Sequence, residues 1–175
     1  IMVAVGCGVQ NNFETYKDMG LNIVVGNIGK SKIVDLINEY LETHNNYYHY
    51  DSNRDLPFED MFINNFDHTR AFIKIQDGCD NFCTYCIIPF VRGKCRSKDF
   101  DEVVNEASKL VDNNHKEIVL TGIHTGSYNN NGKDLTDLIN ELSKIENLKR
   151  IRLSSVEITE LNDKFINMMK INNKF

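Results

Sequence analysis

Three cysteines in the middle of the chain have the spacing of a metal centre. Cys79, Cys83 and Cys86 are separated by three and then by two residues, and they follow an apolar run. Three thiolates can hold three irons of a 4Fe–4S cube and leave the fourth iron without a protein ligand, whereas the four-cysteine sites of electron carriers are closed. The spacing therefore predicts a cluster with one open position, at which a second molecule can bind.

A zinc site is the alternative interpretation of these residues. Together with Cys95 they would supply four thiolates, which is a ligand set that zinc accepts. Such sites usually use two closely spaced pairs, however, and Cys95 stands alone in a basic stretch. A disulfide is disfavoured, because the chain shows no secretory signal and its five cysteines suit a reducing compartment. Iron–sulfur is the favoured interpretation, and zinc remains open.

Composition limits the classes of protein to consider. The chain has 175 residues, of which 41% are hydrophobic and 26% charged, as in ordinary globular proteins of one or two domains. No apolar stretch is long enough to span a bilayer, so we expect no membrane partner and a cytoplasmic location. The formal net charge of −5 argues mildly against nucleic acid as a partner.

The N-terminal third has the pattern of an α/β domain. Residues 1–5 and 21–25 are expected to be buried strands, and residues 33–43 carry apolar side chains at helical spacing. We interpret residues 1–43 as the C-terminal part of such a domain, truncated at its N-terminus. The polar segment 44–68 is predicted to be a linker, with short ordered pieces around residues 57–66.

Strands and helices alternate through residues 69–175, which predicts a parallel sheet in a partial or full β/α barrel. Asp99 and Asp134 are expected to cap the first two helices. The expected strands cover residues 71–76, 117–121 and 150–154, and the expected helices cover residues 100–111, 135–145 and 159–169. Chemistry in such folds lies at the C-terminal ends of strands, where the cysteine loop, residues 121–128 and residues 154–157 are found.

Four further features are candidates for function. Gly122 and Gly126 would let the backbone approach a ligand. His124 is a candidate acid–base group, although a histidine in a loop is more often a hydrogen-bonding residue. Cys7 follows a strand between two glycines, where it is either a buried small residue or a metal ligand. The last feature is a cationic stretch without acids that could bind phosphates, formed by Arg92, Lys94, Arg96 and Lys98.

Several stretches together resemble the radical S-adenosylmethionine (SAM) methylthiotransferases, over nearly the whole chain and in the family's order. They are VAVGCGVQ, VVGNIGK, FIKIQDGCDNFCTYCIIPFVRGKCRS, EIVLTGIHTGSY and RIRLSSVEI. TGIHTGSY and RLSSVEI most resemble the branch that acts on N6-threonylcarbamoyladenosine next to the tRNA anticodon. Ile158, where that branch commonly has proline, is a departure from the pattern.

The resemblance implies the fold, the cofactors and a set of site residues. Residues 1–43 would be the end of the N-terminal methylthiotransferase domain, and residues 69–175 the first half of the radical-SAM β/α barrel. Cys79, Cys83 and Cys86 would hold the SAM cluster, and Cys7 would be the third ligand of a second 4Fe–4S cluster, whose other ligands precede Ile1. The resemblance places Tyr85 near the adenine of SAM. From their places at strand ends, Gly122, Thr125 and Gly126 are candidate contacts to the methionine group of SAM, and Ser155 and Glu157 to its ribose or amine. The alternative interpretations are an ordinary strand–helix connection and a cap for the following segment.

The family installs a methylthio group at C2 of the adenine. One SAM gives the methyl group, a second gives the 5′-deoxyadenosyl radical, and the second cluster supplies or presents the sulfur. The implied partners are tRNA, a flavodoxin- or ferredoxin-type electron donor and a sulfur source, with Arg92, Arg96 and Lys98 contacting tRNA or its phosphates. The chain stops before the family's C-terminal tRNA-binding domain, so we expect it to be inactive alone.

Three alternative functions remain at this point. The chain could come from a methylthiotransferase that acts on isopentenyl-adenosine in tRNA or on a ribosomal protein. From a different class, it could be a non-enzymatic zinc module that binds RNA.

Overall fold

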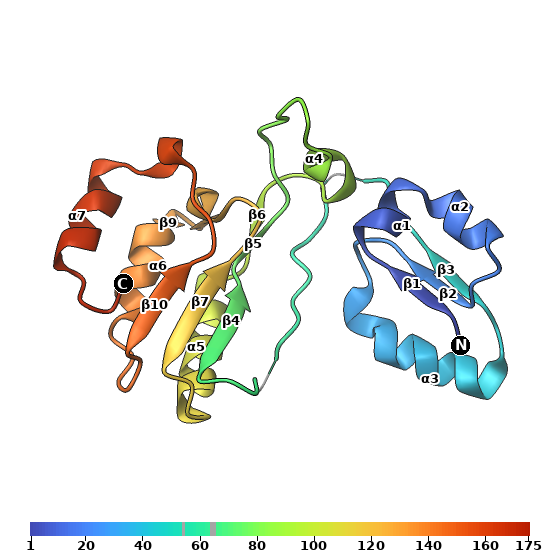
Figure 1. Cartoon of the computed structure of the whole chain (residues 1–175), viewed down its shortest axis with the longest axis horizontal. Coiled ribbons are helices and arrows are strands. Elements are labelled where there is room, and N and C mark those ends of the chain that lie inside the picture. The colour runs from blue at the N-terminus through green and yellow to red at the C-terminus, as the bar shows by residue number, and fades with distance from the viewer. Residues whose placement is uncertain (54, 64–65) are drawn as a thin grey trace. The chain divides into compact units, whose positions relative to one another are not determined.

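The structure is a computed structural model that describes residues 1–53, 55–63 and 66–175. The chain forms two compact units. The first contains residues 1–61 and 79–94, and the second contains residues 62–78 and 95–175. Each unit contains its own three-stranded parallel sheet (Figure 1).

The sheet of the first unit has the order β1-β2-β3, and its central strand is fully buried. Its β-branched residues Ile23–Val25 suit a strand covered on both faces. The strands are β1 (Val3–Val5), β2 (Ile23–Val25) and β3 (Tyr47–His49). The helices are α1 (Cys7–Asn11), α2 (Phe13–Asp18), the 3-10 turn η1 (Lys30–Lys32), α3 (Ile33–Thr43) and α4 (Ile88–Val91).

Strand β3 lies within residues 44–68, which the sequence predicts to be a linker. The beginning of that segment is instead part of the first unit's sheet. Strand β3 pairs with β2 in the register Ile23↔Tyr47, and the Gly26 amide donates to the His49 carbonyl at 2.9 Å. An edge strand is paired on one side only, so a polar, tyrosine-rich segment can form it. The ordered pieces expected around residues 57–66 are not helices or strands in 57–63 or 66, and residues 64 and 65 lie outside the described chain.

The sheet of the second unit has the order β10-β7-β4, with all strands parallel, which confirms the α/β class. Its strands are β4 (Arg70–Lys74), β7 (Glu117–Thr121) and β10 (Arg150–Leu153), and its helices are α5 (Phe100–Asp112), α6 (Leu135–Leu142) and α7 (Asp163–Ile171). Two small antiparallel pairs accompany them, β5 (Gln76–Asp77) with β6 (Arg96–Ser97) and β8 (Asn129–Asn130) with β9 (Lys133–Asp134). The 3-10 turns are η2 (Thr125–Ser127) and η3 (Ile158–Glu160).

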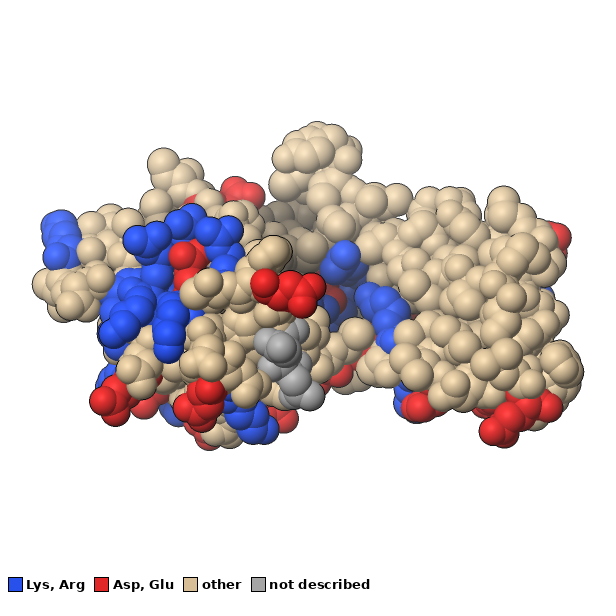
Figure 2. Space-filling model, turned by 60° about the horizontal axis from the view of Figure 1, so that its bottom comes forward, with Lys and Arg blue, Asp and Glu red and all other residues tan. Residues whose placement is uncertain are grey.

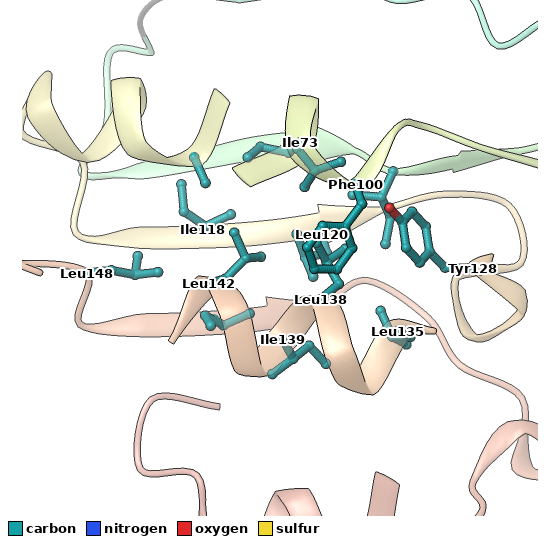
Figure 3. Close-up of a cluster of buried hydrophobic side chains, with 14 of the residues drawn as sticks. Ile73, Phe100, Ile118, Leu120, Tyr128, Leu135, Leu138, Ile139, Leu142 and Leu148 are labelled. Carbon is teal, nitrogen blue, oxygen red and sulfur yellow. The ribbon is translucent and has the colours of Figure 1, made fainter. Parts of the chain in front are cut away.

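One hydrophobic core holds the second unit together. Ile118 and Leu120 of β7 face Leu138 and Leu142 of α6 in this core (Figure 3), and none of the four is exposed to solvent. Residues from β4, β10, α5 and α7 belong to the same cluster. Burying one leucine or isoleucine contributes about 1.5–3 kcal/mol to stability. Many such side chains hold the helices against the sheet, and the sheet in turn positions the loops at the ends of its strands.

The helix caps show how local sequence sets these elements. The Asp99 carboxylate accepts from the amides of Asp101 and Glu102, and Asp134 and Asp137 form a reciprocal capping box at the start of α6, as the sequence predicts for both caps. Helix α7 begins after Asn162, whose side chain accepts from the Phe165 amide at 2.9 Å. The predicted start at Thr159 is therefore wrong, because that residue lies in η3.

Candidate functional site

The three spaced cysteines lie on one irregular loop of the first unit, ahead of α4. Cys79 is buried, Cys83 is exposed and Cys86 is half-buried, and none of the three forms a disulfide within the described chain. The loop is held by its backbone, because the Cys79 amide donates to the Gly93 carbonyl at 3.2 Å and the Cys86 amide donates to the Cys83 carbonyl at 2.9 Å. The loop therefore presents three thiols within eight residues of chain.

The donor chemistry of this loop fits an iron–sulfur cluster, because thiolates are the usual ligands of Fe–S clusters. Among the described residues, no three Cys, His, Asp or Glu side chains are gathered as a group that could hold a metal ion. The three thiols would therefore need to converge when a cluster binds. The assignment of Cys79, Cys83 and Cys86 as cluster ligands therefore rests on their residue type and spacing.

Cys7 and Arg92, which the sequence separates by more than eighty residues, lie together in the first unit. The Arg92 Nε donates to the Cys7 Sγ at 3.3 Å, and that thiol contacts the Asn27 Oδ1 at 3.6 Å. The Asn27 amide group also donates to the carbonyl of Val91 in α4. Asn27 thus joins α4 to the start of α1, and the Arg92 guanidinium donates to the Cys7 sulfur.

The cationic stretch does not present its charges as a strip. Lys98 is 2% exposed, and its ammonium forms a buried ion pair with Glu106 at 2.6 Å. The Arg96 side chain is 10% exposed and its Nη2 lies 3.1 Å from the Asp77 Oδ2. Lys98, a predicted tRNA contact, is therefore buried against a carboxylate that the fold brings to it, and Arg96 is largely committed in the same way.

The loop after β7 uses its side chains for internal contacts. Thr125 is fully buried, and its hydroxyl donates to the Ser155 carbonyl. The Ser127 hydroxyl donates to the His124 carbonyl at 2.7 Å. The Tyr128 hydroxyl donates to the Lys98 carbonyl at 3.0 Å, and burial raises the pKa of this phenol well above its usual value. The side chain of Ser155 itself is exposed.

His124 has a carboxylate partner that sequence reasoning missed. Its Nε2 lies 2.5 Å from the Glu160 Oε1, and both side chains are largely buried. The other oxygen of Glu160 accepts from the Glu157 amide at 2.7 Å. A Cβ at Gly126 would collide with the Glu160 carboxylate, so this glycine makes room for Glu160. Glu157, a predicted SAM contact, is exposed and precedes η3.

Gln76 is a second residue that sequence reasoning missed. It is fully buried, its Nε2 donates to the Gly78 carbonyl at 2.7 Å, and its Oε1 accepts from the His124 amide at 2.6 Å. A Cβ at Gly122 would lie 3.0 Å from Gln76, so that glycine is needed for close packing. The available signal was a polar residue ending an apolar strand. Gln76 joins the chain just before Cys79 to the loop after β7.

Cys95 and Tyr85 complete the predicted set. The Cys95 Sγ accepts from the Gln76 Nε2 at 3.2 Å and lies 3.0 Å from the Ser127 Oγ. The ring of Tyr85 is 91% exposed, so its surface is open to a ligand.

None of the described helices is long and apolar enough to cross a membrane.

Residues 73–171 match the model of the Radical SAM superfamily, which covers more than half of the chain. The chain belongs to this superfamily, whose cofactors are a 4Fe–4S cluster and SAM.

Comparison with curated relatives indicates which members of the superfamily the chain resembles. The chain is 40% identical to the threonylcarbamoyladenosine tRNA methylthiotransferase MtaB of Bacillus subtilis, over 99% of the chain and 40% of that protein. It is 37% identical to the MtaB protein of Aquifex aeolicus, over 97% of the chain and 42% of that protein. It is 32% identical to the ribosomal protein uS12 methylthiotransferase RimO of Clostridium botulinum, over 99% of the chain and 40% of that protein. The chain spans about two fifths of the length of these relatives.

Proposed function

We propose that this chain is part of a tRNA methylthiotransferase that converts N6-threonylcarbamoyladenosine to its 2-methylthio derivative in the anticodon loop. The supporting observation is how the similar proteins are named. Four relatives that are 31–40% identical are named for threonylcarbamoyladenosine, whereas the proteins named for dimethylallyladenosine and for uS12 are each 32% identical. Because the chain spans two fifths of these relatives, the complete activity belongs to the whole protein.

The proposed reaction needs cofactors rather than side-chain acids and bases. The C2–H bond of adenine is unactivated, so proton transfer alone cannot replace it. When bound, the cluster and SAM supply radical chemistry, while the protein holds the reactants and excludes water. We assign the cluster to Cys79, Cys83 and Cys86, and Cys7 to the second cluster.

The observed side-chain contacts support a more specific form of the proposed SAM contacts. Tyr85 offers an exposed ring, and Ser155 and Glu157 offer exposed side chains. The Thr125 hydroxyl is committed to the Ser155 carbonyl, and Gly126 packs beside Glu160. Gly122, Thr125 and Gly126 would therefore contact SAM through their peptide groups rather than through side chains.

The parallel order of β4, β7 and β10, with α5–α7 packed in one core, supports the first half of a β/α barrel within residues 69–175. Residues 1–43, extended by β3, would be the end of the auxiliary-cluster domain. The proposed partners are tRNA, an electron donor of the flavodoxin or ferredoxin type and a sulfur source. The proposed location is the cytoplasm.

The test is complementation of cells that lack the full-length gene, followed by mass spectrometry of tRNA nucleosides. The unchanged gene should restore 2-methylthio-N6-threonylcarbamoyladenosine. Cys83→Ser should abolish it, because one cluster ligand is lost, whereas Cys95→Ser should retain most of it, because a serine hydroxyl can make the same contacts with Gln76 and Ser127.

Two results would contradict the proposal. Restoration of a methylthio group only on isopentenyl-adenosine or on a ribosomal protein would move the chain to another branch. After anaerobic reconstitution, a colourless zinc protein without iron or sulfide would exclude the radical chemistry altogether.

A further inference from the structure

A cluster of cations surrounds the starts of the three strands of the second unit. Lysine and arginine side chains gather on this face, with acidic atoms among and beside them (Figure 2). The cluster, called here the amino-end cluster, consists of Arg70, Lys116, Lys149, Arg150 and Arg152 around Glu117. All of these except Arg152 line a hollow of about 440 Å³, together with His68, Thr69 and Phe72. This gathering contrasts with the net charge of the whole chain, which is −5.

The sheet itself fixes the positions of these residues. Arg70, Glu117 and Arg150 are direct neighbours on β4, β7 and β10. The Lys116 amide donates to the Thr69 carbonyl, and the Lys149 amide donates to the Lys116 carbonyl, each at 2.9 Å. Strand register therefore fixes Arg70, Glu117, Arg150 and Arg152, and backbone hydrogen bonds fix Lys116 and Lys149, which directly precede β7 and β10.

Its charges are far from balanced. The Glu117 Oε1 lies 2.6 Å from the Arg70 Nε and 2.9 Å from the Arg152 Nε, so one carboxylate is shared between two guanidinium groups. The Arg150 Nη1 lies 3.8 Å from the Glu117 Oε2, and the Arg150 side chain is 59% exposed. Within the described chain, Lys116 and Lys149 make no ion pair with a carboxylate. The cluster therefore presents excess positive charge to solvent.

We propose that the amino-end cluster binds the phosphodiester backbone of RNA. The inference rests on the proposed function, which requires an RNA substrate, and it identifies which cations of this acidic chain are free to hold it. Lysine and arginine neutralise phosphates and release counterions. A row of such residues across the amino ends of neighbouring strands suits an anion whose charges repeat along a chain. The cationic stretch that the sequence offered for this task spends Arg96 and Lys98 on internal carboxylates.

The location assigns the cluster a positioning task. It lies at the amino ends of β4, β7 and β10, whereas the loop with Gly122 and Gly126 leaves the carboxyl end of β7. Contacts with phosphates fix orientation and carry no base recognition. The cluster would therefore hold RNA at a distance from the reacting nucleotide and contribute affinity without sequence preference.

The experiment measures binding of a fluorescein-labelled RNA stem–loop to the cofactor-free chain by anisotropy, over a series of salt concentrations. The variant Lys116→Ala/Lys149→Ala/Arg150→Ala removes three exposed or half-exposed cations and should fold normally. At roughly 0.7–0.9 per phosphate contact, the slope of log K against log salt should decrease by about 2–3, and affinity should fall on the order of 100-fold or more at about 0.1 M salt.

The matched control is Lys109→Ala/Lys144→Ala/Lys170→Ala, which changes the net charge equally but removes lysines on or next to α5, α6 and α7. It should keep the wild-type slope. An equal loss in both triple variants, or no loss in the first, would overturn the inference, and so would equally tight binding of poly-glutamate. Because no cofactor or turnover is needed, RNA binding through the cluster would survive even if the whole protein modified another substrate.

Discussion

The loops of the second unit depend on Gln76, whose buried side-chain amide has both of its polar atoms in hydrogen bonds. Gln76 donates to the carbonyls of Asp77 and Gly78 and accepts from the His124 amide. Leaving a buried donor or acceptor without a partner costs about 1–3 kcal/mol, more than one such bond contributes when it is made. Gln76 therefore fixes both the peptide that precedes Cys79 and the start of the turn at Thr125.

This role predicts the effect of Gln76→Leu. The substitution keeps the approximate volume but leaves the His124 amide and the Gly78 carbonyl unpaired, so unfolding free energy should fall by about 1–3 kcal/mol. Hydrogen exchange of the His124 amide, followed by NMR on the cofactor-free chain, should become faster by a larger factor than that of the β7 amides.

Gln10→Leu is the matched control, because Gln10 also bridges two backbone groups, the Asn27 amide and the Asp51 carbonyl, but in the first unit. It should leave exchange at His124 unchanged. If His124 exchanged at the wild-type rate in Gln76→Leu, the amide would not be holding the loop.

At the scale of elements, helix α6 is tied to α7 through charge. The Lys164 ammonium lies 2.8 Å from the Asp134 Oδ2 and 2.7 Å from the Asp137 Oδ1, and these two carboxylates form the capping box of α6. The hydrogen bond from Lys164 is the largest cause that lowers the pKa of Asp137. Cap and ion pair therefore act on the same turn.

The pKa of Asp137 gives this contact a pH dependence. Because the folded-state value is lowered, the stabilisation is present above the unfolded-state pKa of about 4 and is lost as pH falls through the folded-state value. Lys164→Met should lower unfolding free energy by about 0.2–1 kcal/mol at neutral pH, since the pair is partly exposed. The difference from wild type should shrink toward zero in urea melts at strongly acidic pH.

Lys170→Met serves as the control, since this exposed lysine of the same helix has no ion pair with a carboxylate within the described chain. A wild-type difference for Lys164→Met that persisted unchanged at acidic pH would show that lost packing, rather than the carboxylates, causes the destabilisation.

For the molecule as a whole, elements with strong local signals could be predicted and contacts distant in sequence could not. The periodic apolar residues gave β7 and α3 with their observed bounds, and Asp99 and Asp134 were correct as caps because capping is decided within three residues. Strand β3 was missed, since its pairing with β2 depends on residues more than twenty positions away.

The same reasoning explains the errors at the candidate site. A stretch without acids suggested free cations, but Asp77 and Glu106 come to Arg96 and Lys98 only in the fold. Gln76 and Glu160 were missed because a buried polar residue is recognised by its partners, which the sequence does not place. Spacing within one loop, as for Cys79, Cys83 and Cys86, is the kind of information that a sequence alone carries.

The largest structural prediction concerns the core that unites the second unit. Leu138 of α6 is fully buried among residues of all three strands and three helices, so its loss should be felt by the unit as a whole. Leu138→Ala should lower unfolding free energy by about 2–5 kcal/mol, from lost burial and from the cavity left behind. The amides of β4, β7 and β10 should lose protection from hydrogen exchange together, because they share this core.

Leu41→Ala removes the same atoms from α3, where the leucine is 58% exposed, and should change stability by less than about 0.5 kcal/mol. Faster exchange confined to α6 in Leu138→Ala, with β4 and β10 unaffected, would mean that the three strands do not unfold as one cooperative unit. Uniform loss across the sheet would establish that one core holds in register both the loop at the carboxyl end of β7 and the cations at the amino ends.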